Sequence, residues 1–407
     1  MLRAVIVSGC LIGMVVPTQA GDWPQFLGPN RDNGSPEIVA AWSGAPEVLW
    51  RQPVGDAHSS PVVADGRVFA FYQPRGKNAD ALAAFDAATG KKLWESQYDR
   101  PAFTPPFGTG PRGTPTVSGD TVFTLGSTGI LAAWNVKDGN LRWKVDTLTE
   151  FAAKNLFFGI STSPTIVGNQ VIVMVGGEGA GVVAFDKATG KTLWKATDDP
   201  QSYATPIVTE IHGKPQVILL TGAHLLSLSP TGTVLWKFPF RDRLNESSTT
   251  PVRVGNQIIA SSVTAGSVAV EIPASGTEVK PVWKDPKLTC YFSTPVLVGK
   301  ELYMINGAAT LLNPTIVLRC VEAATGKILW EKPNLGKYHA AIIRTGDNKL
   351  LMLDDTGRLT LFQPSTTGFE PLAEAKVCGP TWAHPALADG RLILRDEKEL
   401  IALKLGR

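Results

Sequence analysis

A short phrase that recurs along the chain constrains its fold more than any other feature. It reads AFDAATGKKLW over residues 84–94, AFDKATGKTLW over 184–194 and CVEAATGKILW over 320–330, and weaker copies end in Trp143, Trp236 and Trp283. A unit that recurs every ~40–50 residues predicts a stacked or circular array of repeats and not an ordinary domain with a single core.

Each repeat has a second half, in which a small polar residue, a proline and an aliphatic residue follow one another. A hairpin turn that contains glycine comes next, and then another β-rich run, so each unit is predicted to hold about four short strands. Proline is tolerated at a strand start because the missing N–H costs little there. Eight such starts can be counted, at Pro61, Pro115, Pro164, Pro206, Pro251, Pro295, about Ala341, and Pro385.

Four-stranded units around a central axis form a β-propeller. The predicted fold is therefore all-β, an eight-bladed β-propeller of four-stranded antiparallel blades. The eighth unit has no Leu-Trp strand of its own, whereas residues 47–50 near the chain start supply one. We therefore predict that the N-terminal strand closes the ring and removes the open sheet edges. The predicted division is a signal peptide over 1–20, a non-repeat segment over 21–41 that lies over one face of the ring, and the propeller over 42–407.

Most of the tryptophans share one position in the repeat. An aromatic side chain at a repeated position buries a large area and is typical of packing between neighbouring blades. We predict this structural role, and no catalytic role, for Trp50, Trp94, Trp143, Trp194, Trp236, Trp283 and Trp330.

Charge and the N-terminal residues indicate the compartment. The formal net charge is +3, which is near neutral for this length and argues against nucleic acid as a partner. Residues 1–20 read as a secretory signal, with Arg3, an apolar run over 4–16 and a small-residue cleavage site at 18–20. That run is too short to span a bilayer, so export to the periplasm or the outside is predicted without a transmembrane segment.

The cysteines leave two questions open. Val7-Ser8-Gly9-Cys10 is similar to a lipoprotein processing box, and a lipid anchor at Cys10 is the less favoured alternative because few apolar residues precede it. Cys290, Cys320 and Cys378 allow at most one internal disulfide, and we interpret them as small buried hydrophobic residues. The sequence has no CxxC or HExxH spacing, so no zinc site is predicted.

Two insertions depart from the repeat between early blades. Residues 99–113 form a loop rich in proline, glycine and phenylalanine, and residues 147–160 contain a predicted helical turn over 148–154. The glycine spacing of the first loop does not match a phosphate-binding motif. Because loops on a rigid scaffold usually carry binding, this sector is the predicted recognition surface.

A candidate ligand site comes from the central channel, which the first strand of each blade lines. The residues three places before the repeat prolines mix aromatic and basic side chains, which could hold a planar or anionic ligand by stacking and charge. The favoured alternative is that they plug a narrow channel with ordered water. The candidates are His58, Arg112, Ser161, Tyr203, Ser248, Phe292, Tyr338 (register uncertain by one residue) and Trp382.

The Asp-x-x-Thr-Gly-Lys-x-Leu-Trp repeat resembles that of the quinoprotein-type propellers, the family with PQQ-like repeats. One branch consists of quinone-dependent alcohol dehydrogenases, and another of non-catalytic propellers such as the BamB-type proteins of outer-membrane assembly. The opening run over 22–31 also looks like that of secreted planctomycete-type members. For the enzymes the resemblance implies pyrroloquinoline quinone (PQQ), calcium and a pair of adjacent cysteines. This chain has no Cys-Cys, and its acids and amides match no motif of that branch (Glu178, Asn245, Glu246, Asp354 and Asp355).

The sequence therefore predicts an exported scaffold, expected to be monomeric, that binds a protein or another partner in the cell envelope without catalysis. No catalytic residue, metal site or cofactor is assigned. Two alternatives stay open at this point. One is a PQQ- and calcium-dependent oxidoreductase with a divergent site that acts on an alcohol or a sugar. The other is a propeller that binds a small ligand or a glycan.

Overall fold

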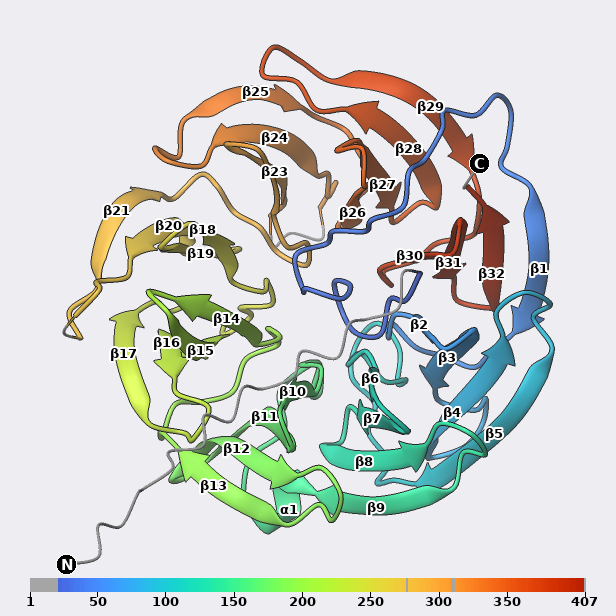
Figure 1. Cartoon of the computed structure of the whole chain (residues 1–407), viewed down its shortest axis with the longest axis vertical. Coiled ribbons are helices and arrows are strands. Elements are labelled where there is room, and N and C mark those ends of the chain that lie inside the picture. Colours follow the sequence, from blue (N-terminus) through green and yellow to red (C-terminus); the bar gives the residue numbers. More distant parts are fainter. Residues whose placement is uncertain (1–20, 276, 309–311, 406–407) are drawn as a thin grey trace, which may run out of the picture.

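Eight four-stranded antiparallel sheets stand around a central axis in the computed structural model, which describes residues 21–275, 277–308 and 312–405 (Figure 1). The prediction of an eight-bladed propeller is confirmed. Seven blades are built from four consecutive strands, and the eighth combines three strands from the end of the chain with one from its start.

The first four blades follow the chain from the innermost strand outward. Blade one contains β2 (Val62–Ala64), β3 (Arg67–Tyr72), β4 (Ala79–Asp86) and β5 (Lys92–Asp99). Blade two contains β6 (Thr116–Ser118), β7 (Thr121–Leu125), β8 (Ile130–Asn135) and β9 (Leu141–Asp146). Blade three contains β10 (Thr165–Val167), β11 (Gln170–Gly177), β12 (Ala180–Asp186) and β13 (Thr192–Ala196). Blade four contains β14 (Ile207–Ile211), β15 (Lys214–Leu220), β16 (His224–Leu228) and β17 (Val234–Pro239).

The remaining blades complete the circle. Blade five contains β18 (Val252–Val254), β19 (Gln257–Ser262), β20 (Gly266–Glu271) and β21 (Lys280–Asp285). Blade six contains β22 (Val296–Val298), β23 (Glu301–Asn306), β24 (Val317–Glu322) and β25 (Ile328–Lys332). Blade seven contains β26 (Ala340–Arg344), β27 (Leu350–Asp354), β28 (Arg358–Gln363) and β29 (Glu370–Lys376). Blade eight contains β30 (Ala386–Ala388), β31 (Arg391–Arg395), β32 (Glu399–Lys404) and β1 (Val48–Pro53).

Burial explains why the middle strands read as apolar runs. The second and third strands of a blade are covered by neighbouring blades on both faces, so β3 and β4 are buried along nearly their whole length. In the outermost strand β5, every second side chain from Trp94 to Tyr98 is half-buried or buried and the others are exposed, as in a strand with one covered face. The hydrophobic clusters accordingly lie between blades, and one of them joins blades seven, eight and one.

The N-terminal strand closes the ring, as predicted. β1 pairs antiparallel with β32, with Trp50 opposite Ala402 and Pro53 opposite Glu399. This pairing covers the edge of β32 that would otherwise stand open, and an unpaired edge strand invites association with other chains.

The tryptophan and the glycine of the repeat meet across the interface between blades. The Trp50 indole lies on Gly90 of blade one, and its Nε1–H donates to the Ala87 carbonyl at 3.0 Å. Gly90 has a φ of +71°, and a Cβ at this position would come within 2.6 Å of the Trp50 ring. The same contact recurs between Trp94 and Gly139, Trp143 and Gly190, Trp194 and Gly232, and Trp283 and Gly326.

The indole N–H groups find two kinds of acceptor. Trp94, Trp143, Trp283 and Trp330 donate to backbone carbonyls of the following blade, at 2.8–3.1 Å. Trp194 and Trp236 instead donate to glutamine side chains of their own blades, Gln170 and Gln216. All seven predicted blade tryptophans therefore have a hydrogen-bond partner, as amphipathic aromatic side chains in a packed interface require.

The small polar residues before the prolines link the innermost strands. In each link a backbone N–H of one blade donates to a side-chain hydroxyl of the next. The final link joins the last blade to the first, because the His384 N–H donates to Ser60 Oγ at 2.9 Å. The other links run from Ser60 to Thr114, from Thr114 to Ser163, from Ser163 to Thr205 and from Thr250 to Thr294, at 3.0–3.2 Å.

The non-repeat segment over 21–41 crosses the ring and touches innermost strands of several blades (Figure 1). Trp23 pairs with Val63 of blade one, and Gly34 pairs with Arg344 of blade seven. The buried Arg31 donates through Nη2 to the Pro164 carbonyl beside blade three, at 2.8 Å. The segment is thus fixed across one end of the channel.

Several local predictions meet different outcomes. The helical turn expected over 148–154 is shorter and begins earlier, as α1 (Thr147–Glu150), because Asp146 caps its first turn and Ala152 has a φ of +50° just beyond its end.

Cys290, Cys320 and Cys378 are buried free thiols. Among the described residues, no helix has the length and apolar character needed to cross a membrane. The predicted signal peptide over 1–20, with Cys10, lies outside the described residues.

We predict that Gly90→Ala destabilises the ring more than Gly66→Ala, which is its matched control. Both glycines have a φ near +70°, but a Cβ at Gly66 meets nothing within 4 Å. The shared backbone strain should cost about 1–2 kcal/mol, and displacement of Trp50 should add about 1–3 kcal/mol for Gly90→Ala alone. Urea unfolding of the two variants measures the difference, and equal losses would contradict a tight contact at Trp50.

Candidate functional site

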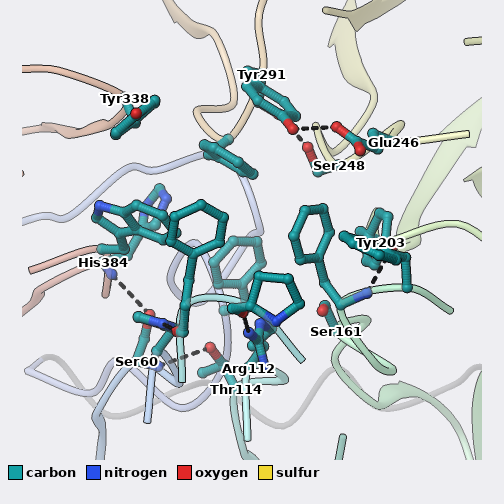
Figure 2. Close-up of a pocket in the computed structure, with 18 of the residues that line it drawn as sticks. Ser60, Arg112, Thr114, Ser161, Tyr203, Glu246, Ser248, Tyr291, Tyr338 and His384 are labelled. Carbon is teal, nitrogen blue, oxygen red and sulfur yellow. Dashed lines mark hydrogen bonds between the residues drawn. The ribbon is translucent and has the colours of Figure 1, made fainter. Parts of the chain in front are cut away.

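A cavity of about 480 Å³ opens at the end of the channel where the innermost strands begin (Figure 2). All eight channel residues predicted from the repeat line it, so they surround an open space. That a ligand binds among them stays a prediction. These residues are His58, Arg112, Ser161, Tyr203, Ser248, Phe292, Tyr338 and Trp382.

The repeat register brings these side chains together. Each belongs to the loop that leads from the outermost strand of one blade into the innermost strand of the next. Because the loops occupy equivalent places around the ring, residues at equivalent positions converge on the axis. Blade seven lacks the proline, yet Tyr338 still lines the cavity, two residues before β26.

Other lining residues were not predicted from the repeat. The two insertions expected to form a recognition surface supply Pro106, Phe107, Phe157 and Phe158. The aromatic residues of these insertions were the sequence feature that could have indicated their place in the cavity lining. Phe26 reaches the cavity from the non-repeat segment, which no periodicity could place. The rest are Ser60, Thr114, Leu244, Glu246, Tyr291 and His384.

Six rings in sequential contact form an aromatic belt around the cavity. Neighbouring ring centroids lie between 3.8 and 6.2 Å apart, and four of the five pairs fall in the range of about 4.5–7 Å that favourable aromatic pairs adopt. The order around the belt is Tyr291, Phe292, Trp382, Phe107, Phe158 and Tyr203.

Glu246 stands where the belt is open, between its two end residues. The Tyr291 hydroxyl donates to the Glu246 carboxylate, and Figure 2 shows the two side chains facing each other. Burial, with the charge of Asp242 adding to it, raises the pKa of the Glu246 carboxyl above its ordinary value. At the other end of the belt, the Tyr203 hydroxyl accepts from the Phe158 N–H at 3.2 Å, and burial and then Glu246 raise the pKa of Tyr203.

Arg112 holds the loop that carries Phe107. Its guanidinium donates to the carbonyls of Pro106, Gly108 and Gly110 at 3.0–3.3 Å. These bonds fix a loop in which Phe107 has a φ of +62°, an unusual conformation for a residue with a side chain. Burial lowers the pKa of Arg112 to about 10. Arg112 is therefore a positioning residue for this edge of the belt.

Histidines beneath the belt are held neutral. His339 and His384 are both buried, and their ring centroids lie 5.0 Å apart. Burial lowers the pKa of His384 to about 4, and it lowers that of His339 well below its ordinary value. Burial and the charge of Arg112 also lower the pKa of His58 to about 4. At neutral pH these imidazoles add no charge to the cavity.

The lining residues do not fit the cofactor that a quinoprotein resemblance implies. PQQ is a flat molecule with several carboxylates, and it needs cationic partners and a surface for stacking. Among the described lining residues, Arg112 is the one permanent cation, and its N–H groups already serve the loop carbonyls. His58 and Phe292 already stack on the Trp382 indole, at 5.1 and 5.5 Å. No group of three or more His, Cys, Asp or Glu residues in the described part of the chain could hold a metal ion.

Comparisons with known proteins agree on the architecture. The family model described as "Outer membrane protein assembly factor BamB" matches residues 32–156 and 77–316, which together span more than half of the chain. A protein of that name from Shewanella oneidensis is 23% identical over 362 residues, which cover 86% of this chain and 76% of the relative.

Two solved structures share the fold. The quinohemoprotein alcohol dehydrogenase from Comamonas testosteroni has a TM-score of 0.65 at 14% identity, over 96% of this chain and 82% of its own. BamB from Moraxella catarrhalis has a TM-score of 0.57 at 16% identity, over 90% of this chain and 98% of its own. At such identities these likenesses show the fold alone.

We predict that acid destabilises the propeller through its buried histidines. In the unfolded chain histidine takes up a proton below its ordinary pKa of 6.5, whereas folded His384 does so near pH 4. The free energy of unfolding should therefore fall as the pH drops from 6.5 to 4, by up to about 3 kcal/mol for His384. Urea unfolding across this range should give a flatter profile for His384→Gln than for the parent chain. Parallel profiles would show that His384 is not held neutral.

Proposed function

The chain belongs to the family of PQQ-repeat β-propellers described as outer membrane protein assembly factor BamB, and from this premise we propose that it is an exported, non-catalytic scaffold that binds a protein partner in the cell envelope. The observation that carries the proposal is a set of exposed apolar side chains around the cavity mouth. We call Phe107, Phe157 and Leu244 the mouth rim.

The mouth rim has the character of a binding surface. Phe157 is 67% exposed, Leu244 49% and Phe107 47%. The three come from different inter-blade loops, yet all line the same cavity. Exposed apolar groups that gather at one place on a folded protein commonly mark an interaction site, and aromatic anchors often contribute most of the binding free energy at such sites.

The location and the kind of partner rest on the family. Two relatives named outer membrane protein assembly factor BamB match most of this chain, which supports a partner in the envelope. The signal peptide predicted over 1–20 supports export. A scaffold role also agrees with a cavity wall built mainly from packing and positioning groups.

We predict that a photo-reactive phenylalanine analogue at Phe157 forms a covalent adduct with one discrete envelope protein. The same analogue at Leu193, which is 47% exposed on outer strand β13 and far from the mouth rim in sequence, is the control and should give none. The partner is then identified by mass spectrometry, purified and titrated with the parent chain. A double variant, Phe107→Ser with Phe157→Ser, should weaken its affinity at least ~10-fold, or about 1.4 kcal/mol. Equal adducts at both positions, or an unchanged affinity, would contradict the mouth rim as the interface.

A quinone titration separates this proposal from the oxidoreductase alternative. PQQ with Ca²⁺ should leave the melting temperature of the parent chain unchanged, because Arg112 already serves loop carbonyls and the Trp382 indole is already stacked by His58 and Phe292. Saturable stabilisation that requires both components, followed by reduction of a dye acceptor with an alcohol, would replace the scaffold with a quinone-dependent oxidoreductase.

A further inference from the structure

The carboxylate of Glu246 is the one acidic group among the described residues that line the cavity. It closes the gap between Tyr291 and Tyr203, so the belt and this carboxylate together encircle the space. Figure 2 shows Glu246, Tyr291 and Ser248 grouped on one wall, with Tyr203 beside them. The cavity therefore combines many aromatic rings with a single negative charge.

This carboxylate has no counter-ion in the described part of the chain. It takes part in none of the ion pairs found there, and its side-chain contact is the Tyr291 hydroxyl. The charged neighbour Asp242 is also an acid, and it accepts from the Glu246 N–H. Glu246 is half-buried, and even partial removal of a carboxylate from water without a paired cation has a cost, so a cation that enters the cavity would be stabilised there.

The rings of the belt favour the same kind of ligand. The face of an aromatic ring attracts a cation, by about 0.5–1 kcal/mol at exposed sites and by 2 kcal/mol or more when water is excluded. Tyr203 and Tyr291 lie next to the carboxylate, and Phe158 and Phe292 follow them along the belt. The opposite charge in the cavity, Arg112, is turned toward the loop carbonyls that it holds.

We propose that the cavity binds an organic cation, an ammonium or guanidinium group on an apolar body, with Glu246 as its counter-ion and the belt as its wall. The space of about 480 Å³ suits a ligand with one or two rings or an equivalent aliphatic body. The proposal goes beyond partner binding, because a cation can enter the cavity whether or not a protein docks on the mouth rim. A small amine and a lysine side chain of a peptide share this chemistry.

The test compares probes that differ in charge but have similar size. Isothermal titration of the full chain at pH 8 uses 2-phenylethylammonium, the neutral 2-phenylethanol and the anionic 3-phenylpropionate. The ammonium should bind at least ~10-fold more tightly than the alcohol. Glu246→Gln should abolish this preference and leave the affinity for the alcohol unchanged. Glu271→Gln, an exposed acid at the end of β20, is the matched control and should retain the preference.

A pH series provides a second readout if Glu246→Gln folds poorly. The groups that face this carboxylate are Asp242 from its own loop and the phenols of Tyr291 and Tyr203. Because Glu246 must be ionised to pair with a cation and its pKa is raised, ammonium affinity in the parent chain should fall as the pH drops through this titration. Affinity for the alcohol should not change with it.

Two results would overturn the proposal. One is equal affinity for the ammonium and the alcohol, which would make the cavity a purely apolar site. The other is preference for the anion, which would make Arg112 the dominant charge. The source of the cation is distinguished by a blocked Phe-Lys dipeptide amide and its norleucine analogue. Preference for the lysine peptide over the free amine supports a partner side chain, and the reverse preference supports a small molecule.

Discussion

The contact between a tryptophan of one blade and a glycine turn of the next organises this molecule. Trp50, Trp94 and Trp143 each lie on a glycine with positive φ, where a Cβ would come within 2.4–2.7 Å of the indole. Glycine thus serves two needs at once, since it permits the left-handed turn and leaves room for the ring. Because both partners are in the same repeat, the contact recurs at five of the eight interfaces between neighbouring blades in the described part of the chain.

The shape of the cavity depends on how firmly these contacts hold the blades together. Its walls are loops, and loops hold a fixed geometry when the elements beneath them do not move relative to one another. The hydroxyl links at Ser60, Thr114 and Ser163 tie the innermost strands together directly below the mouth. Arg112 then orders one loop from within by serving its carbonyls. The belt of rings is thus assembled from distant parts of the chain, which the rigid blades beneath hold in place.

The sequence predicted the position of residues that recur in every repeat, but it could not place residues that have no equivalent in other repeats. The spacing of the repeat predicts the number of blades, the closure of the ring by β1 and the eight residues at the cavity mouth. Residues at equivalent positions of the repeat must converge on the axis. Phe26 and Glu246 have no equivalent in other repeats, so their places depend on tertiary contacts that no period encodes. The helix over 147–150 differs from the predicted turn because a local cap, the Asp146 side chain, determined its start. Binding of a ligand at the cavity mouth remains a prediction.

The pairing of β1 with β32 also sets the order in which this protein can be completed. In the sequence β1 precedes every other strand of the ring, and its partner β32 at Glu399–Lys404 follows them all. Until the two strands pair, blade eight lacks its outermost strand and the hydrophobic cluster shared by blades seven, eight and one is incomplete. Long-range pairing of this kind is slow to form because the intervening chain must first be ordered. A chain that has emerged without β32 consequently carries an open ring, and ring closure cannot occur until β32 has been made.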